Sequence, residues 1–413
     1  MKTLIVTQYF WPENFLINDL AMGLLERGHR VTVLTGKPNY PSGRFFPGYG
    51  FLGKIAEDYN GVAVRRVPLL PRGDGGRLRL ALNYASFAIS ATLLGAMVCR
   101  EEYDAILVYE PSPVTVGLPA LWLKKLRRAP IFFWVQDLWP ESLAATGAVR
   151  SALILRTVEK LVRWIYRGCD RILTQSRAFF EPIEKLGVER ERILYFPNSA
   201  ESLYRPVQTG PDERSRFGLP EGFIVMFAGN IGAAQDFESI IQAAELLKGH
   251  ADIHWAVLGD GRMYPWVQQQ VAARQLSGTF HLLGRHPLDE MPRYFAMADA
   301  MLVTLKKDPI FALTIPSKVQ SYLACGRPIV AAVDGEGARV IDEAGAGLTA
   351  PAENPAALAE SVLSLARMGP AKRNALGASG RSYFEKNFER DMLIDRLEGW
   401  LYEMCGRRLA CAS

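Results

Sequence analysis

The chain has 413 residues, 49% of them hydrophobic and 22% charged, which predicts two or three folded domains and excludes a disordered or low-complexity protein. Its formal net charge of +5 is uneven, because residues 1–205 carry 27 Lys and Arg against 19 Asp and Glu, while the remainder carries 21 against 24. No nucleic-acid-binding motif accompanies the basic half, so we expect a phosphate-bearing substrate or an anionic membrane surface as its partner rather than nucleic acid.

Short apolar runs alternate with segments of helical period throughout the first half. The start, MKTLIVTQYF, contains one Lys and has no small-residue cleavage site, so we predict a buried first strand rather than a signal peptide. This alternation is typical of βαβ units and a parallel sheet. The strands that we predict are 3–7, 31–35, 62–67, 105–109, 131–135, 170–174 and 192–195.

Residues 80–99 form an uncharged segment that is about long enough to span a bilayer. Asn83, Ser86 and Ser90 recur at helical spacing, and such a polar stripe is typical of a helix at a surface or a membrane interface. Three arginines just ahead of the segment and the basic run at 124–128 favour docking on anionic lipid. A buried core helix and a transmembrane helix are the alternatives.

A polar stretch at 199–221, rich in Pro and Gly, predicts a linker. A second alternating series of strands and helices follows it. We predict its strands at 223–229, 252–259, 279–284, 300–305 and 328–333, and its helices around 236–248, 262–275, 289–297, 317–325 and 355–368.

The two series predict an α/β protein of two doubly wound, Rossmann-like domains that face a central cleft. The first domain is expected at 1–198 and the second at 222–385, and a C-terminal helix at 386–413 is expected to pack back toward the first domain. In open α/β sheets ligands bind beyond the carboxyl ends of the strands, so candidate site residues are sought there.

The first strand of the second domain ends at Gly229, and Asn230 and Gly232 follow before a helix that begins near Asp236. Glycines at this place allow backbone N–H groups to approach a phosphate at the helix N-terminus. Gly259 and Asp260 end the next parallel strand and are expected at the same edge of the sheet. The alternative is an ordinary tight turn between strand and helix.

The segment Thr314-Ile315-Pro316-Ser317-Lys318 precedes a further predicted helix. Pro316 suits the helix entry, Ser317 is placed to cap the helix and Lys318 lies in its first turn. A lysine opposes the helix dipole there, so its position favours a bound anion such as a diphosphate. A solvated lysine is the alternative.

In the first domain, the apolar strand IFFWVQD ends at Asp137, where a carboxylate would point into the cleft. The loop after the first strand, residues 9–14, carries three aromatic residues that could stack on a sugar, together with Glu13. We include Asp137, Glu13 and Lys318 as candidate catalytic residues. A helix-capping role for Asp137 and a packing role for the aromatic residues are the alternatives.

Five scattered cysteines form no C-x-x-C pair, and no His-rich or metal-ligand spacing accompanies them. This pattern argues against a disulfide scaffold and a structural zinc site, and it favours a reducing, cytoplasmic location. The first domain also lacks a G-x-G-x-x-G fingerprint, so a nicotinamide dinucleotide site is not expected there.

Eight motifs, in the same order across both domains, resemble the retaining family 4 glycosyltransferases of the GT-B fold. The most similar branch is that of bacterial surface-polysaccharide enzymes related to N-acetyl-L-fucosamine transferases, and the resemblance covers nearly the whole chain. The motifs are QYFWPE, LLERGHRVTVLTGKPNYPSG, VQDLWPESL, FPNS, FAGNIGAAQD, VLGDGR, HLLGR and IPSKVQSYLACGRPIV.

The resemblance implies that the second domain binds a UDP-sugar donor and that the first receives a lipid-linked or glycan acceptor, with neither metal nor a separate cofactor. The donor residues would then be Gly229, Asn230, Gly232, Gln235, Gly259, Asp260, Leu282, Leu283, Ser317, Lys318 and Glu336.

This chain departs from the family pattern at several of these places. Many members carry Arg and Lys where this chain has Asn230 and Gln235, which places more of the charge on Lys318. A pair of glutamates that usually holds the ribose is replaced by Leu313 and Ser321, and Glu336 is our candidate substitute. Many members also have His at the position of Gln136.

The resemblance thus implies front-face transfer of a hexose with retention, in which the diphosphate assists removal of the acceptor proton and Asp137 orients the acceptor or the donor sugar. The expected setting is biosynthesis of a surface polysaccharide such as O-antigen or lipopolysaccharide, at the cytoplasmic face of the cell membrane. A non-catalytic scaffold of the same fold and a GT-B sugar-nucleotide epimerase are the alternatives.

Overall fold

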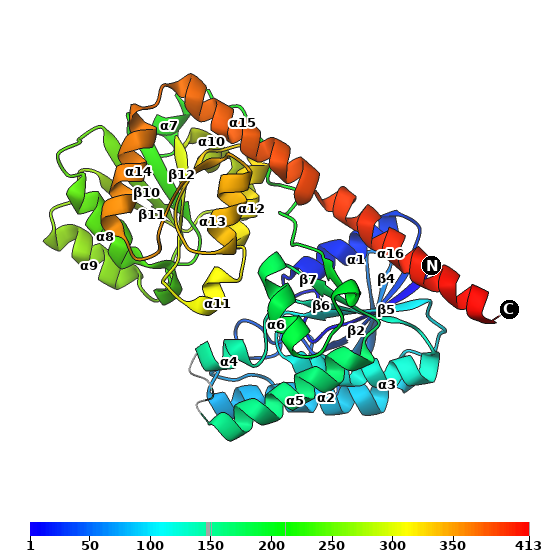
Figure 1. Ribbon diagram of the computed structural model, residues 1–413. Coiled ribbons are helices and arrows are strands. Elements are labelled where there is room, and N and C mark those ends of the chain that lie inside the picture. Colours follow the sequence, from blue (N-terminus) through cyan, green and yellow to red (C-terminus); the bar gives the residue numbers. More distant parts are fainter. Residues whose placement is uncertain (146–148, 150, 211, 413) are drawn as a thin grey trace. The chain divides into compact units, whose positions relative to one another are not determined.

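The computed structural model describes residues 1–145, 149, 151–210 and 212–412, and it divides into two compact units (Figure 1). Unit 1 comprises Met1–Pro197 with Asp391–Ser413, and unit 2 comprises Asn198–Arg390. Each unit is built on one β-sheet flanked by helices, so the chain has the α/β architecture of two Rossmann-like domains that its sequence predicts.

The sheet of unit 1 has eight strands in the order β3-β4-β2-β1-β5-β6-β7-β8. All its pairings are parallel except that of the edge strand β3 with β4. The elements are β1 (Lys2–Val6), α1 (Leu16–Glu26), β2 (Arg30–Gly36), β3 (Ala56–Tyr59), β4 (Val62–Val67), α2 (Arg77–Val98), β5 (Ala105–Glu110), η1 (Val114–Val116), α3 (Gly117–Arg127), β6 (Ile131–Val135), α4 (Glu141–Ala145), α5 (Ala152–Gly168), β7 (Arg171–Thr174), η2 (Arg177–Phe179), α6 (Phe180–Lys185), η3 (Arg190–Arg192), β8 (Ile193–Tyr195) and α16 (Arg390–Ala412).

Every strand predicted in the first half is present. The central strands β5 and β6 are buried along their whole length, which is why they read as continuous apolar runs rather than as alternating patterns. The polar strand β3 was not predicted, because at the edge of the sheet it buries none of its side chains fully.

The sheet of unit 2 has six parallel strands in the order β11-β10-β9-β12-β13-β14. Its elements are α7 (Glu213–Arg216), β9 (Phe223–Ala228), η4 (Ala233–Gln235), α8 (Phe237–Leu246), β10 (Ile253–Leu258), α9 (Tyr264–Ala273), β11 (Phe280–Gly284), η5 (Leu288–Glu290), α10 (Met291–Met297), β12 (Ala300–Thr304), α11 (Pro309–Ala312), α12 (Ser317–Ala324), β13 (Ile329–Ala332), α13 (Glu336–Glu343), β14 (Gly347–Ala350), α14 (Pro355–Arg367) and α15 (Pro370–Asn387).

The predicted strands and helices of unit 2 are present, and β14, α7, α11, α13 and α15 are additions to them. The stretch predicted as a linker, 199–221, belongs to unit 2 rather than lying free of it. Ala200 and Leu219 are buried in its core, and the ring of Tyr204 stacks on Phe295 at a centroid distance of 5.7 Å. The stretch is therefore anchored to unit 2 by a few buried side chains, although Pro206, Gly210 and Gly218 are exposed.

The last helix, α16, packs on unit 1. Leu393, Ile394, Leu397 and Leu401 are buried in the same hydrophobic cluster as residues of β1, β2 and α1. Arg27 at the end of α1 makes ion pairs with three acidic residues of α16, at N–O distances of 2.8–3.3 Å to Asp395, Glu398 and Asp391.

The polar stripe of α2 points toward the rest of unit 1 and not toward solvent or a membrane interface. Asn83 is fully buried, and its Nδ2 donates to the carbonyl oxygen of Leu70 at 2.6 Å while its Oδ1 accepts from Gln8 at 2.7 Å. Ser90 donates to the carbonyl oxygen of Pro68 at 2.5 Å. The stripe faces inward because the irregular chain after β4 has backbone groups that need partners.

The apolar side of α2 is consequently exposed. Its exposed side chains are Leu78, Leu82, Ile89, Leu93 and Met97. The buried-core interpretation of this helix is therefore wrong. By length and hydropathy α2 is the one helix of the described chain that would suffice to cross a membrane, but Asn83 and Ser90 tie it to unit 1.

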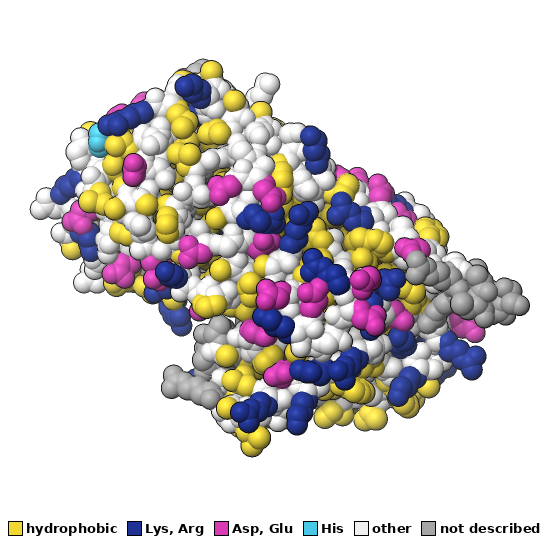
Figure 2. All heavy atoms as spheres, in the orientation of Figure 1, with side chains coloured by type: hydrophobic (Ala, Val, Ile, Leu, Met, Phe, Trp, Pro, Cys, Tyr) yellow, Lys and Arg dark blue, Asp and Glu magenta, His cyan; other side chains and the backbone are white. Residues whose placement is uncertain are grey.

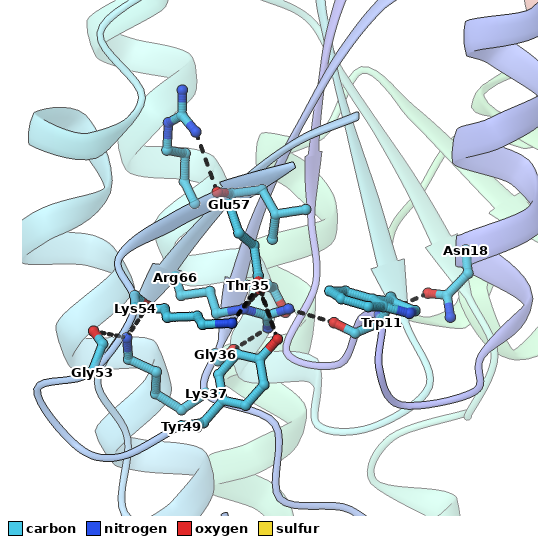
Figure 3. A network of polar contacts seen from close by, with 12 residues as sticks. Trp11, Asn18, Thr35, Gly36, Lys37, Tyr49, Gly53, Lys54, Glu57 and Arg66 are labelled. Atoms are coloured by element: carbon cyan, nitrogen blue, oxygen red, sulfur yellow. Dashed lines mark hydrogen bonds and ion pairs between the residues drawn. The ribbon is translucent and has the colours of Figure 1, made fainter. Parts of the chain in front are cut away.

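A buried polar network joins the loops after β1 and β2 to the strands β3 and β4 (Figure 3). Arg66 is buried and contacts the carboxylate of Glu57 and the carbonyl oxygens of Gly36 and Trp11. Tyr49 donates to Glu57 at 2.9 Å. The network contains two buried cations: Arg66 is paired with a carboxylate and carbonyls, and Lys37 donates to the carbonyl oxygens of Gly53 and Lys54, as burial of a charge requires.

Candidate functional site

Two glycine turns lie against each other at the carboxyl edge of the unit 2 sheet. Gly229 after β9 has φ +138° and Gly259 after β10 has φ +131°, conformations that favour glycine. A Cβ on Gly259 would lie 1.9 Å from the carbonyl oxygen of Gly229. A Cβ on Gly229 would lie 2.8 Å from Cε of Lys318. The glycines therefore allow two backbones and a lysine side chain to meet.

The first turn does not offer the row of free amides that we predicted. The amide of Gly229 donates to Leu258, that of Ile231 to Asp260 and that of Gly232 to Asn230, at 2.9–3.0 Å. A 3₁₀ turn, η4, separates the glycines from α8, which begins at Phe237. These amides stabilise the paired turns and are not available to bind a phosphate.

Free amides are found instead at the start of α12. The backbone N–H groups of Ser317 and Lys318 donate to no acceptor in the described chain. Helix N-termini carry partial positive charge, so these two groups are suited to an anion. Ser317 is exposed and is the first helical residue, and the cap position belongs to Pro316 without any side-chain hydrogen bond. The predicted capping role of Ser317 is therefore wrong.

Lys318 lies across Gly229 with its ammonium group among apolar atoms. Its Nζ is 3.6 Å from the ring centroid of Phe227 and donates to Oε1 of Gln235. No acidic side chain pairs with it in the described part of the chain. Burial lowers the pKa of Lys318 to about 7. A cation with one neutral acceptor and no counter-charge is suited to receive an anionic ligand.

The remaining predicted donor residues lie around the same edge. Glu336 begins α13 and is held by Arg339 through N–O contacts of 2.6 and 2.9 Å. The start of α13 adjoins that of α12, because a Cβ on Gly337 would be 3.2 Å from Cδ of Pro316. Leu282 and Leu283 on β11 are half-buried and pack on the two hydrophobic clusters that flank the sheet.

Asp137 lies just beyond the end of β6 in unit 1. It is partly exposed, and burial raises its pKa to about 6. The next helix, α4, begins only at Glu141, so Asp137 is too far upstream to be its N-cap. The capping alternative therefore fails, and the carboxylate is available to a ligand.

Glu110 was missed by the sequence analysis. It ends β5, the strand adjacent to β6, and it is fully buried. Burial raises its pKa well above the ordinary value, and the neighbouring Asp137 carboxylate adds to this effect. The signal in the sequence was a glutamate that ends a wholly apolar strand, AILVYE, but such a residue resembles an ordinary strand end.

Glu13 is buried and supports a loop. Its Oε1 accepts the backbone N–H groups of Asn39 at 2.8 Å and Tyr40 at 2.7 Å. Burial raises its pKa to about 7 although those two hydrogen bonds favour the ionised form. Glu13 lies in the loop after β1 and Asp137 lies just after β6, and β5 separates these two strands in the sheet. The described part of the chain shows no contact between the two carboxylates.

The aromatic residues near Glu13 pack on one another. The Tyr9 ring stacks on Phe15 with a centroid distance of 5.0 Å, and Phe10 is buried against Tyr59. These contacts agree with the alternative that the rings have a packing role. Among the described residues, no group of three or more His, Cys, Asp and Glu side chains is placed to hold a metal ion.

Two family models match the chain. Residues 16–199 match the glycosyl transferase 4-like domain, and residues 222–368 match glycosyl transferases group 1. The relative named probable glycosyltransferase WbjE, from Pseudomonas aeruginosa, is 30% identical over 341 residues, which are 79% of this chain and 81% of the relative. A glycosyl transferase named WcaI from Escherichia coli K12, whose name refers to colanic acid biosynthesis, is 26% identical over 79% of this chain and 82% of its own length.

Solved structures show the same fold. HepE from Anabaena in complex with UDP has a TM-score of 0.71 and 14% sequence identity, and the match covers 98% of this chain and 100% of HepE. WaaG, a glycosyltransferase involved in lipopolysaccharide biosynthesis, has a TM-score of 0.62 with 14% identity over 96% of this chain and 98% of WaaG.

Proposed function

Because the chain belongs to the family 4 glycosyltransferases of the GT-B fold, we propose that it transfers a hexose from a UDP-sugar to a lipid-linked saccharide with retention of configuration. The proposed setting is the biosynthesis of a bacterial surface polysaccharide, since the names of WcaI and WaaG refer to colanic acid and lipopolysaccharide. The observation that carries the donor half is the unpaired ammonium of Lys318 beside the free amides of α12.

The donor diphosphate is proposed to bind at the start of α12. Lys318 and the amides of Ser317 and Lys318 would neutralise the charge that develops on the leaving diphosphate. These groups supply positive charge without a divalent ion, so we expect transfer to proceed without metal. The complexes of HepE with UDP and with UDP-glucose support a UDP-linked donor.

Asp137 is proposed to orient the acceptor hydroxyl or the donor sugar. Retention by front-face attack lets a diphosphate oxygen take the acceptor proton, and little acid or base chemistry is then required of side chains. Asp137 has a partly exposed carboxylate that caps no helix, which suits this orienting role. The buried Glu110 is a candidate positioning residue, because it ends the strand paired with β6 and its carboxylate lies close enough to Asp137 for that charge to raise the pKa of Glu110.

The protein is proposed to work at the cytoplasmic face of the cell membrane as a peripheral protein. Exposed apolar residues of α2 support this location, as do the neighbouring basic residues of α3 and α5. Figure 2 shows hydrophobic and basic side chains together along the lower edge of the molecule, where Figure 1 places these helices. A surface of this kind favours anionic lipid.

A transfer assay tests the proposal. Purified protein is incubated with radiolabelled UDP-sugars and a bacterial lipid extract, with and without EDTA, and the anomeric configuration of the product is read by NMR. We expect UDP to raise the melting temperature, label to enter the lipid fraction despite EDTA, and the configuration to be retained. Stabilisation by UDP without transfer from any UDP-sugar would contradict the proposed activity.

A further inference from the structure

An apolar groove opens on unit 1 between α2, α3 and α5. Its volume is about 980 Å³, which is at the upper end of the usual range for ligand pockets, about 300–1,000 Å³. Its walls are formed by Ala88, Ile89, Thr92, Leu93, Leu118, Leu121, Trp122 and Trp164, with Lys124, Lys125, Arg128, Arg167 and Gly168 at one end.

The groove walls are apolar side chains that the fold leaves in contact with solvent. Leu93 is 68% exposed, Trp164 is 55% exposed and Trp122 is 44% exposed. Leu93 faces outward because the polar stripe of α2 is turned inward onto unit 1. Contiguous exposed apolar surface of this kind usually marks a binding site.

The cations at one end of the groove define the charge of its occupant. Lys124 is paired with Asp170 at 2.6 Å, but Lys125, Arg128 and Arg167 have no acidic side chain within ion-pair distance in the described part of the chain. An occupant with an apolar body and an anionic end would complement both parts of the groove.

The groove and Asp137 lie at opposite edges of the same sheet. Asp170, which pairs with Lys124, also accepts the backbone N–H of Ile131 at 2.7 Å, so the basic end of the groove lies near the amino end of β6. Asp137 follows the carboxyl end of that strand. If Asp137 holds the sugar of the acceptor, the point at which the acceptor's lipid joins that sugar lies at the opposite edge of the sheet from this groove. The groove is therefore not placed to receive the acceptor lipid.

We propose that the groove binds a hydrocarbon chain of an anionic membrane phospholipid, with the lipid phosphate against Lys125, Arg128 and Arg167. This inference rests on the proposed peripheral location and adds a specific lipid site to it. Tryptophan side chains such as Trp122 and Trp164 favour boundaries between hydrocarbon and water, as the rim of such a site would be.

A titration in solution tests the site without a bilayer and without donor sugar. The probe is cis-parinaric acid, a fluorescent fatty acid that accepts energy from tryptophan, and the competitor is lysophosphatidylglycerol below its micelle concentration. We expect saturable binding of one probe per full-length protein and its displacement by the competitor. Lysophosphatidylcholine should displace it at least fivefold less well, because its headgroup has no net charge.

Two leucines of α2 provide a matched pair of variants. Leu93→Glu places a charge in the groove, whereas Leu78→Glu changes a residue of the same helix that is 72% exposed and does not line the groove. We expect at least a tenfold loss of probe affinity in Leu93→Glu and less than a twofold change in Leu78→Glu. Thr92→Phe, which fills the groove without adding charge, should also weaken binding.

Three results would overturn the inference: no saturable binding, equal losses in both leucine variants, or displacement by a polyprenyl phosphate but not by lysophosphatidylglycerol. The last would assign the groove to the acceptor lipid. If the protein transfers sugar but shows no such binding, only the lipid site is refuted. If it binds the probe but transfers no sugar, only the proposed activity is refuted.

Discussion

Burial shifts the pKa values of Lys318 and Asp137 in the directions that disfavour their charged forms. The pKa of Lys318 falls to about 7 and that of Asp137 rises to about 6. Neither side chain has an ion-pair partner in the described chain. Such groups reduce stability in the free protein and become useful when a ligand supplies the missing partner.

Lys318→Met is expected to raise stability and weaken UDP binding. In the unfolded chain the lysine titrates near 10.4, so the folded protein resists its protonation at neutral pH. The gain in melting temperature should be largest below pH 7 and shrink as the pH rises toward 10. Affinity for UDP, measured by calorimetry, should fall ten- to a hundredfold, because a charge-assisted hydrogen bond contributes about 1.5–3 kcal/mol.

Lys372→Met on α15 is the control for this change, because Lys372 is exposed and lies outside the site. It should alter neither the melting temperature nor the affinity. Equal UDP affinity in wild type and Lys318→Met would remove Lys318 from the donor site.

Asp137→Asn is expected to fold normally, bind UDP and lose at least a hundredfold in turnover. Its stability should be at least that of the wild type, because the carboxylate caps no helix and its burial disfavours the charged form. In the wild type, kcat/KM should fall as the pH drops below about 6, where Asp137 becomes protonated. Glu141→Gln, a neighbouring exposed carboxylate, serves as the control. Turnover of Asp137→Asn within threefold of wild type would show that the carboxylate is not used.

At the scale of elements, the glycines in the turns after β9 and β10 leave space for the side chain of Lys318. Gly229→Ala would place a methyl group 2.8 Å from Cε of Lys318 and force an alanine into a φ of +138°. We expect at least a tenfold loss of UDP affinity. Gly249→Ala, with no atom within 4 Å of the new Cβ, should bind UDP as wild type does. The pair is compared by calorimetry, and equal affinities would contradict the packing argument.

The inward polar face of α2 is open to a stability test. Asn83→Ala leaves the amide of Gln8 and the carbonyl oxygen of Leu70 without their partner. Unsatisfied buried polar groups cost about 1–3 kcal/mol, so the free energy of unfolding in urea should fall by about that amount. Leu82→Ala, at the neighbouring exposed position, should change it by less than about 0.5 kcal/mol. An unaltered Asn83→Ala protein would show that the stripe is not a structural contact.

At the scale of the whole molecule, the hydrophobic core of unit 1 includes side chains of α16, the last helix of the chain. Leu401 on α16 is fully buried, and Leu401→Ala should lower the stability of unit 1 by about 2–5 kcal/mol. Hydrogen exchange should therefore speed up in β1 and β2 but not in β9 and β10. Tyr402→Ala, at the exposed neighbouring position, is the control. Faster exchange in both units would mean that they do not unfold separately.

The sequence by itself determined the strands other than β3 and β14, most of the helices and the position of Lys318 at a helix start. Parallel strands buried on both faces need continuous apolar runs, so β5, β6 and β9 could be recognised from local sequence. The place of Lys318 in the first turn of α12 could also be predicted, because helix starts have signals in the local sequence.

Only the tertiary structure decided which groups meet. Glu110 and Asp137 are 27 positions apart and become neighbours because β5 pairs with β6. The amides of Gly229 and Ile231 are already bonded because β10 and the turn after it lie against them, whereas the amides of Ser317 and Lys318 at the start of α12 have no acceptor in the described chain. The apolar face of α2 is exposed because Asn83, on the opposite face, donates a hydrogen bond to the carbonyl oxygen of Leu70. Local sequence determines backbone conformation, whereas strand order and packing determine the partner of each polar group.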